Sequence, residues 1–188
     1  AVADYILQNK KGNTVSNLSS SRALRDITRK QGGDYFAAAV GEVNVVESMK
    51  QNYAVIGGEG NGGIIYPDLH YGRDALVGIA LFLTHLAKSG KSCSELRKTY
   101  PEYVIAKKKM ELTPQIDVDD ILITIKSKFS DKEIIDIDGV KIEFEHGWVH
   151  LRKSNTEPII RIYAESSTNE KANELADKII NEIKSIIQ

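Results

Sequence analysis

Cysteine is nearly absent from this sequence: Cys93 is the single one among 188 residues. One thiol excludes an internal disulfide and every metal site built from several cysteines, and we expect Cys93 to be a small, semi-buried residue near a helix end. Long apolar runs are absent too, since none approaches the roughly 18 residues of a membrane span. The opening AVADYILQNK has polar interruptions where a signal peptide is apolar. These absences predict a cytoplasmic protein that does not enter a membrane.

An excess of charge of either sign is also missing. The 25 Lys and Arg residues nearly balance 26 Asp and Glu residues, for a net charge of -1. No global positive field exists to attract nucleic acid or an anionic membrane, so any recognition of an anion must be local. With 41% hydrophobic and 27% charged residues, the composition is that of a globular chain, long enough for one domain or two small ones.

The first residue is Ala1 rather than Met, and it already stands in a helix-like pattern with Val2, Tyr5 and Ile6. We therefore expect a fragment, with further domains of the same protein upstream.

Strands and helices alternate over the first hundred residues. Short strands are predicted within NTVSNLSSS, YFAAAV and YAVIGG, and helices over RALRDITRKQ and VNVVESMKQ. We expect the longest buried helix from Ala75 to Ala87, apolar nearly all round, with Asp74 as its N-cap and Gly90 at its end. This alternation is typical of an α/β domain, a mixed sheet with flanking helices, which we place at residues 1–105.

The pattern changes in YPEYVIAKKKMELTPQ, where two prolines and a lysine run indicate a domain boundary near residue 105. We interpret the lysines as a solvated linker or a strand edge rather than a binding patch. A mixed segment follows, VDDILITIKSKF, and then strands that turn at Asp138-Gly139 and at His146-Gly147 before the strand IIRIYAES.

A capping box from Ser167 to Glu170 is predicted to open a last helix. Its apolar face comprises Ala172, Leu175, Ala176, Ile179, Ile183, Ile186 and Ile187. Residues 106–188 are therefore predicted to form a smaller α+β domain, an antiparallel sheet backed by helices.

The glycine-rich stretch GEGNGG, residues 58–63, fits the dinucleotide spacing G-x-G-x-x-G. That motif needs a helix to begin inside the loop, whereas IIYPD follows here and Pro67 favours an extended chain. A second interpretation is sugar binding: Glu59 can accept hydrogen bonds from two hydroxyls, and Asn61 can both donate and accept. A flexible turn with Glu59 in solvent stays equally open at this point.

The stretch RKSNTEP, residues 152–158, gathers donors in one turn. Arg152 can grip a phosphate bidentately, Ser154 and Thr156 offer hydroxyls, and Asn155 offers an amide. Polar turns between strands are also common without a function, so the phosphate interpretation is favoured but not exclusive.

None of the four histidines forms a pair with metal-ligand spacing beside a carboxylate, so no metal site is predicted in this chain. His150 shares a strand face with Arg152, and we expect it to be an ordinary surface histidine.

Taken together, the loops resemble those of the α-D-phosphohexomutases, the family of phosphoglucomutase, phosphomannomutase and phosphoglucosamine mutase. The segments VSNLSSSRAL, VGEVNVVESM, AVIGGEGNGG, GRDALVGIALFLTHLAKSGKSCSEL and RKSNTEPIIRIYAE occur in the order of the family's third and fourth domains. The family pattern R-x-S-N-T-E-P matches residue for residue, and the resemblance runs essentially the whole length of the chain.

This resemblance implies an isomerase that interconverts hexose or hexosamine 1-phosphate and 6-phosphate. In the family, a phosphoserine passes its phosphoryl group to a sugar phosphate, the bisphosphate turns end for end, and the other phosphate returns to the serine. The serine domain and the magnesium-binding domain lie upstream in such enzymes. No catalytic residue is therefore expected here, and this chain alone is expected to be inactive.

The resemblance assigns the sugar to Glu59 and Asn61 and the non-reacting phosphate to Arg152, Ser154, Asn155 and Thr156. Magnesium and a hexose bisphosphate activator are implied for the full-length enzyme, with neither bound by residues of this chain. The expected partners are the sugar phosphate and the missing N-terminal domains.

Four positions bear on the substrate. Many members end the sugar loop with a histidine where this chain has Gly63, and Glu42 replaces a basic or imidazole residue. Asn61 is the residue found in mutases for acetylated amino sugars. Arg73 is an extra cation that could face the cleft, although an ion pair with Asp74 or Asp68 is the favoured interpretation.

Two rival functions stay open. The chain could be a stand-alone sugar-phosphate binding or regulatory module without catalysis. A dinucleotide oxidoreductase survives only if a helix begins at Gly62.

Overall fold

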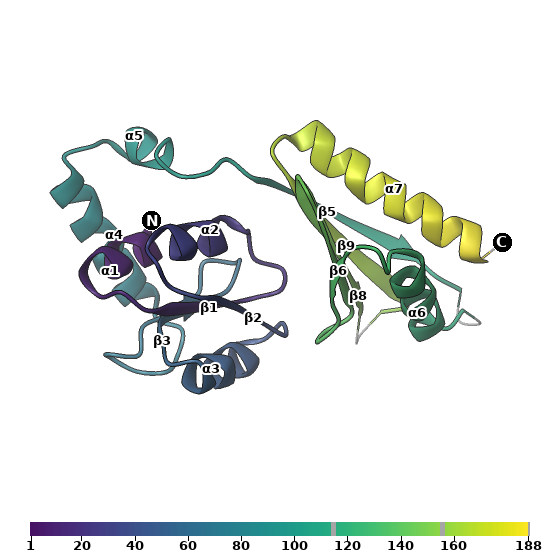
Figure 1. Ribbon diagram of the computed structural model, residues 1–188, viewed down its shortest axis with the longest axis horizontal. Helices are drawn as coiled ribbons and strands as arrows, with labels where there is room; N and C mark the ends of the chain where they lie inside the picture. Colours follow the sequence, from purple (N-terminus) through teal and green to yellow (C-terminus); the bar gives the residue numbers. More distant parts are fainter. Residues whose placement is uncertain (114–115, 155–156, 188) are drawn as a thin grey trace. The chain divides into compact units, whose positions relative to one another are not determined.

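A computed structural model of the chain describes residues 1–113, 116–154 and 157–187. It divides into two compact units, Ala1–Glu102 and Tyr103–Gln188, which are described separately (Figure 1). The division falls just before the strand β5 (Val104–Glu111), every residue of which pairs with a strand of the second unit.

The first unit is built on a four-stranded mixed sheet with the order β2-β1-β3-β4. β1 runs parallel to both β2 and β3, and β4 is antiparallel to β3. The predicted mixed sheet with flanking helices is therefore confirmed. The strands are β1 (Asn13–Asn17), β2 (Tyr35–Ala38), β3 (Ala54–Gly58) and β4 (Ile64–Ile65).

Helices pack against this sheet through a small apolar core. Met49 is fully buried and lies against β3, where a Cβ at Gly57 would fall 2.4 Å from the Met49 sulfur. The glycine therefore leaves the space that the thioether fills. The helices of the unit are α1 (Val2–Asn9), α2 (Ala23–Lys30), α3 (Glu42–Gln51), α4 (Ala75–Ser89) and α5 (Cys93–Arg97).

The ends of α4 are as predicted, but its burial is not. Asp74 accepts a hydrogen bond from the Val77 amide at 2.9 Å, and Gly90 ends the helix with φ of 63°. The prediction of a buried helix is wrong, because three apolar side chains are exposed: Leu76 by 78%, Ile79 by 55% and Leu83 by 54%. Within this unit α4 packs chiefly toward α1, α5 and β4, so only part of its apolar surface is covered. At 15 residues it is also shorter than the final 19-residue helix.

His85 of α4 takes part in a buried polar network. Its Nε2 lies 2.8 Å from the Tyr100 hydroxyl, which donates to an Asp4 carboxylate oxygen at 3.0 Å. Since the hydroxyl hydrogen points at Asp4, the imidazole Nε2–H is the donor to Tyr100. Loss of hydration on burial lowers the pKa of His85 below its ordinary value of 6.5.

A pH dependence of stability follows from this lowered pKa. The unfolded chain binds the proton near pH 6.5 and the folded chain only at lower pH, so His85 stabilises the first unit above pH 6.5. That stability is lost as the pH falls from this value toward the folded pKa.

Urea unfolding at several pH values, followed by amide signals of the first unit, measures the effect. His85→Gln, which keeps a donor for Tyr100, should flatten the profile. His146→Gln in an exposed turn is the control, and an equal slope in wild type and His85→Gln would contradict the assignment.

The second unit is a five-stranded antiparallel sheet with the order β5-β9-β8-β7-β6. The predicted α+β architecture is confirmed, and the lysine run lies on β5, an edge strand, where Lys108 pairs with Asp177 at 2.7 Å. Lysines on an edge discourage pairing with other strands. The remaining strands are β6 (Glu133–Ile135), β7 (Val140–Phe144), β8 (Gly147–Lys153) and β9 (Ile159–Ser166).

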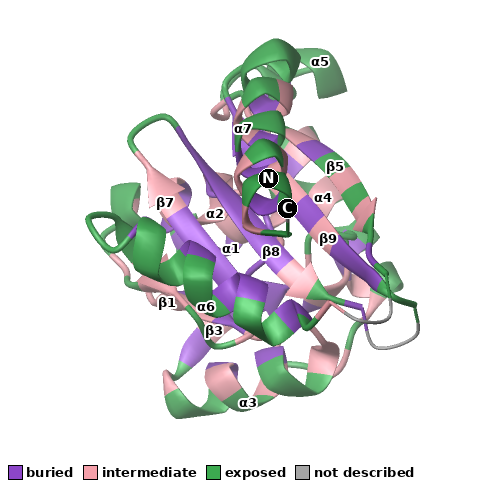
Figure 2. Cartoon of the chain, turned by 90° about the vertical axis from the view of Figure 1, so that its right-hand side faces the viewer, coloured by how far each residue is buried: buried purple, intermediate pink, exposed green. Residues whose placement is uncertain are grey.

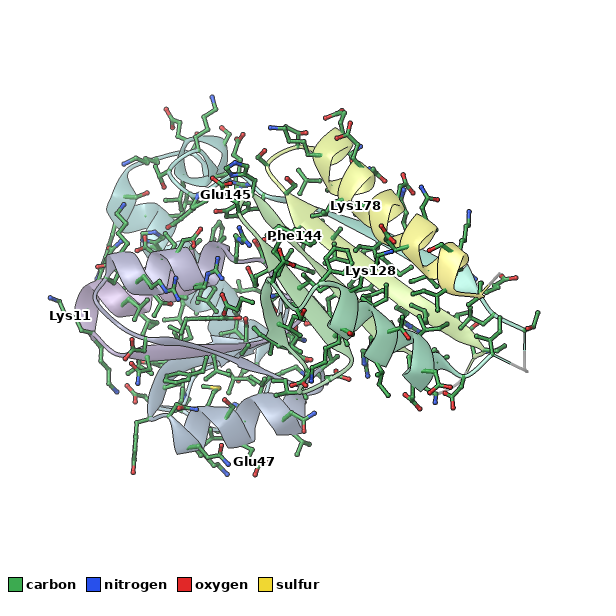
Figure 3. The ribbon with its side chains drawn as sticks, turned by 45° about the vertical axis from the view of Figure 1, so that its right-hand side comes forward. Lys11, Glu47, Lys128, Phe144, Glu145 and Lys178 are labelled. Carbon is green, nitrogen blue, oxygen red and sulfur yellow. The ribbon has the colours of Figure 1, made fainter. Side chains whose placement is uncertain are left out.

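Two helices complete this unit, α6 (Val118–Lys128) and α7 (Asn169–Ile187). The mixed segment noted in the sequence is α6, capped by the Asp117 carboxylate, and its buried residues join those of α7 and the sheet in one apolar core. β8 is buried along most of its length (Figure 2). At the margin of the core, the Lys178 ammonium of α7 lies 5.8 Å from the ring centroids of Phe129 and Phe144. Figure 3 shows Lys178 and Phe144 among the side chains of this unit.

Two local predictions are corrected. The cap of α7 is Thr168 rather than Ser167, since its hydroxyl accepts from the Lys171 amide at 3.3 Å and the helix begins one residue later than expected. Cys93 is exposed rather than semi-buried, because it occupies the first turn of the short helix α5. Within the described ranges, no helix has the length and apolar character to span a membrane.

Candidate functional site

The candidate sugar loop leaves the sheet at the carboxyl ends of β1 and β3. These strands are parallel, with Ser16 opposite Gly58, so Asn17 and Glu59 emerge side by side. The chain continues from β1 to β2 on one side of it and then to β3 on its other side. Ligands of open α/β sheets bind at such a switch point. A cavity of about 330 Å³ lies here, lined in part by Ser16, Ser20 and Glu59.

Glu59 is held from two directions. The Asn17 side-chain amide donates to its Oε1 at 3.1 Å, and Arg73 Nη1 donates to its Oε2 at 3.2 Å. The Glu59 side chain is 6% exposed. The interpretation of a flexible turn with Glu59 in solvent is therefore wrong, because both carboxylate oxygens have donors from other elements.

The favoured interpretation, an ion pair of Arg73 with Asp74 or Asp68, is wrong. Arg73 Nε donates to Glu42 Oε2 at 2.8 Å and its backbone N–H donates to Glu42 Oε1, also at 2.8 Å. These two bonds lower the pKa of Glu42, the backbone one contributing most. Glu42, at the start of α3, therefore fixes Arg73 beside Glu59.

Asn61 shapes the loop itself. Its Oδ1 accepts from the Gly63 amide at 3.0 Å, and the Glu59 N–H donates to the Gly63 carbonyl at 2.9 Å. Gly62 has φ of 92°, which favours glycine. The side chain of Asn61 is thus engaged in the turn, and the residue is exposed.

In the second unit, Arg152 and Ser154 occupy the end of β8 and the turn after it. Arg152 Nε donates to Asp138 Oδ1 at 3.1 Å, and the guanidinium side chain is 29% exposed. Ser154 is buried, and its backbone N–H donates to the Ile159 carbonyl at 3.1 Å. Asn155 and Thr156, the other two residues assigned to the phosphate, lie outside the described residues.

His150 is buried, contrary to the expected surface position, and its Nε2–H donates to the Asp138 carbonyl at 2.7 Å. Asp138 therefore engages both His150 and Arg152, through its carbonyl and its carboxylate respectively. Its position at the tip of the β6–β7 turn depends on Gly139, which has φ of 71°.

The dinucleotide interpretation is wrong. The residues after the glycine loop form β4 (Ile64–Ile65), and the next helix begins only at Ala75. A pyrophosphate would find no helix N-terminus inside the loop.

Models of protein families match the chain over both units. Residues 1–103 match the "Phosphoglucomutase/phosphomannomutase, alpha/beta/alpha domain III" and residues 104–182 the "Phosphoglucomutase/phosphomannomutase, C-terminal domain". The chain belongs to the phosphoglucomutase/phosphomannomutase family. It corresponds to domain III and the C-terminal domain of these α-D-phosphohexomutases, so the family resemblance of the sequence is confirmed.

Curated relatives in this family are longer than the chain. The phosphoglucomutase/phosphomannomutase of Thermococcus kodakarensis is 39% identical over 178 residues, which are 92% of this chain and 38% of the relative. The phosphoglucosamine/phosphogalactosamine mutase of Sulfurisphaera tokodaii is 36% identical over 176 residues, 93% of this chain and 38% of the relative. The chain thus spans well under half the length of these two relatives.

Solved structures of other proteins have the same fold as this chain. A phosphoglucomutase/phosphomannomutase family protein from Burkholderia thailandensis matches 97% of this chain with 40% of its own, at 20% identity and a TM-score of 0.75. The Aspergillus fumigatus N-acetylphosphoglucosamine mutase, in complex with GlcNAc-6P and magnesium, matches 98% of this chain with 42% of its own, at 16% identity and a TM-score of 0.69.

The part of the chain that the structure describes contains no set of ligands for magnesium. No group of three or more His, Cys, Asp or Glu side chains among those residues could hold a metal ion. No described residue is therefore assigned to the metal.

Sequence reasoning missed two residues that orient the candidate site. Asn17, which holds Glu59, stands at the carboxyl end of a predicted strand, and this position in a parallel sheet was the available signal. Asp138, which holds Arg152, stands out in the sequence only as half of an Asp-Gly turn, and nothing local in the sequence links it to a residue 14 positions away.

Proposed function

We propose that this chain supplies the sugar-binding and phosphate-binding parts of a phosphohexomutase that interconverts hexose or hexosamine 1-phosphate and 6-phosphate. The observation that carries the proposal is the buried Glu59 carboxylate, held by Asn17 and Arg73 at the carboxyl ends of the parallel strands β1 and β3 in a member of this family. The phosphoserine, the bisphosphate intermediate and magnesium belong, in this proposal, to the full-length enzyme.

Glu59 suits a pair of ring hydroxyls. An ionised carboxylate has about four lone-pair positions, and the donors from Asn17 and Arg73 use one on each oxygen. One acceptor position per oxygen is left for substrate, which matches two neighbouring hydroxyls. The fixed rotamer means that little side-chain entropy is lost when the sugar binds.

Arg152 suits a phosphate. The guanidinium has five N–H donors, and Asp138 accepts from the one on Nε, which orients the planar group. The two terminal nitrogens carry the geometry that bidentate phosphate recognition requires. We assign Ser154 to the same phosphate, together with Asn155 and Thr156.

The two assignments fit the chemistry of a mutase. Phosphoryl transfer depends chiefly on positioning and on charge stabilisation, so the phosphate that does not react must be held while the other is transferred. In this proposal Arg152 and its loop hold that phosphate, and Glu59 grips the sugar in both orientations. We expect no turnover by the 188 residues alone.

The proposed substrate class includes both hexose and hexosamine phosphates. The two relatives above are named for glucose and mannose in one case and for glucosamine and galactosamine in the other. Asn61 supports an amino sugar, and glucosamine 6-phosphate is accordingly the first probe.

A titration of the 188-residue chain tests the proposal. Glucosamine 6-phosphate should shift the amide signals of Glu59 and Ser154, whereas inorganic phosphate should shift only that of Ser154. Glu59→Gln keeps the size of the side chain but loses its charge, and we expect about tenfold weaker binding of the sugar phosphate, because a charged hydrogen bond is weakened. Its affinity for inorganic phosphate should be unchanged.

Lys10→Ala removes an exposed charge outside the proposed site, the partner of Asp68 at 2.8 Å, and serves as the control. If saturating glucosamine 6-phosphate moves neither amide in the wild-type chain, these residues do not form the binding site and the proposal is wrong.

A further inference from the structure

Arg73 occupies a space that exists because residue 63 is glycine. A Cβ built at Gly63 would fall 2.7 Å from Arg73 Cδ, closer than unbonded carbons approach, and 3.1 Å from Cγ. An isolated β-bridge between Arg73 and Ile65 holds the backbone next to the strand that leaves the loop. The arginine side chain and the missing side chain at residue 63 are therefore complementary.

The protein partners of Arg73 orient its guanidinium without accepting hydrogen bonds from all of its nitrogens. Glu42 accepts from Nε and Glu59 from Nη1, and no described residue accepts a hydrogen bond from Nη2. The side chain is 48% exposed, whereas that of Glu59 is 6% exposed. A guanidinium is rigid and planar, so two anchored nitrogens also fix the direction of the third.

We infer that Arg73 is a further sugar-binding residue, which donates from Nη2 to a ring hydroxyl next to those accepted by Glu59 and holds the Glu59 carboxylate in place. The inference rests on the proposed function, since it assigns a new contact in the same sugar site. Glu42 is the positioning residue that acts through Arg73. The Arg73 donor and the Glu59 acceptor then lie side by side, the combination that neighbouring sugar hydroxyls require.

Calorimetric titrations of the 188-residue chain test the contact. The ligands are glucose 6-phosphate, its 2-deoxy, 3-deoxy and 4-deoxy analogues, and inorganic phosphate. Arg73→Ala should weaken binding of glucose 6-phosphate about tenfold, the effect of losing a charged hydrogen bond. The loss should disappear for the one deoxy analogue that lacks the hydroxyl in question, and inorganic phosphate should bind as before. Lys10→Ala is the control cation.

Substitutions at residue 63 give a second, independent test. Gly63→Ala should displace Arg73 and reproduce part of its loss, whereas the same change in an Arg73→Ala background should cost nothing further, because the steric conflict is gone. This non-additivity is the signature of the shared space. Glu42→Gln should give an intermediate loss with glucose 6-phosphate and none with inorganic phosphate.

The outcomes separate this inference from the proposed function. An unchanged affinity in Arg73→Ala, or an equal loss for the parent sugar and all three deoxy analogues, overturns the Arg73 contact, and the proposed function still stands if Glu59→Gln weakens sugar binding. If neither Glu59→Gln nor Arg152→Ala alters the affinity for glucose 6-phosphate, or if the wild-type chain binds none, both are overturned.

Discussion

Replacing Arg152 with alanine should weaken the binding of inorganic phosphate to this chain by ~10- to 100-fold. A hydrogen bond to a charged group contributes about 1.5–3 kcal/mol, and each 1.4 kcal/mol corresponds to about a factor of ten in affinity. Arg152 offers the guanidinium of the phosphate loop, and Asp138 holds it in place at 3.1 Å. Calorimetry with inorganic phosphate, or phosphorus NMR of the ligand, measures the dissociation constant.

Arg97→Ala is the matched control, since this exposed arginine lies in the first unit and its guanidinium donates to the carbonyls of Tyr100 and Pro101. It should leave the dissociation constant unchanged. An Arg152→Ala chain that binds phosphate as tightly as the wild type would remove Arg152 from the site.

Replacing Ile125 with alanine should lower the free energy of unfolding of the second unit by about 2–5 kcal/mol. Ile125 of α6 is 0% exposed and lies in the core between the helices and the sheet. Truncation removes buried methyl groups and leaves a cavity that the packed neighbours fill only in part. Because small domains are stable by about 5–15 kcal/mol in total, this is a large fraction. Urea unfolding followed by amide signals of the second unit measures it.

Ile123 provides a matched control two residues away on the same helix. It is 65% exposed, so Ile123→Ala leaves no cavity in the core, and alanine is the better helix former. We expect a change within about 0.5 kcal/mol. Equal effects of the two substitutions would mean that the face of α6 assigned to the core is wrong.

The final helix and α4 show where periodicity succeeds and where it fails. In α7 the apolar face predicted from the sequence contains the buried residues Ala172, Ala176, Ile179 and Ile183. In α4 the apolar residues go nearly all round, which carries no information about which side has neighbours, and Leu76 and Ile79 are exposed. A pattern with two kinds of residue identifies a face, whereas a uniform pattern does not.

The site residues divide in the same way. Arg152 and Ser154 stand in one short motif, so residue types and spacing alone were enough to nominate them. The partners that orient the site come from elsewhere in the chain: Asn17 is 42 residues from Glu59, and Glu42 is 31 residues from Arg73. Such pairs depend on strand order and on the register of parallel strands, which no local pattern reports.

The sequence by itself determined the family, the two kinds of sheet and the two loops, because these depend on short motifs and on the alternation of strands and helices. Only the tertiary structure decided that the Glu59 side chain is buried and that Arg73 pairs with Glu42 and Glu59 rather than with Asp68 or Asp74. The physical reason is that an ion pair forms with whichever carboxylate the fold brings within about 4 Å of the guanidinium. For Arg73 the fold brings two carboxylates from other elements, in a space left open by Gly63.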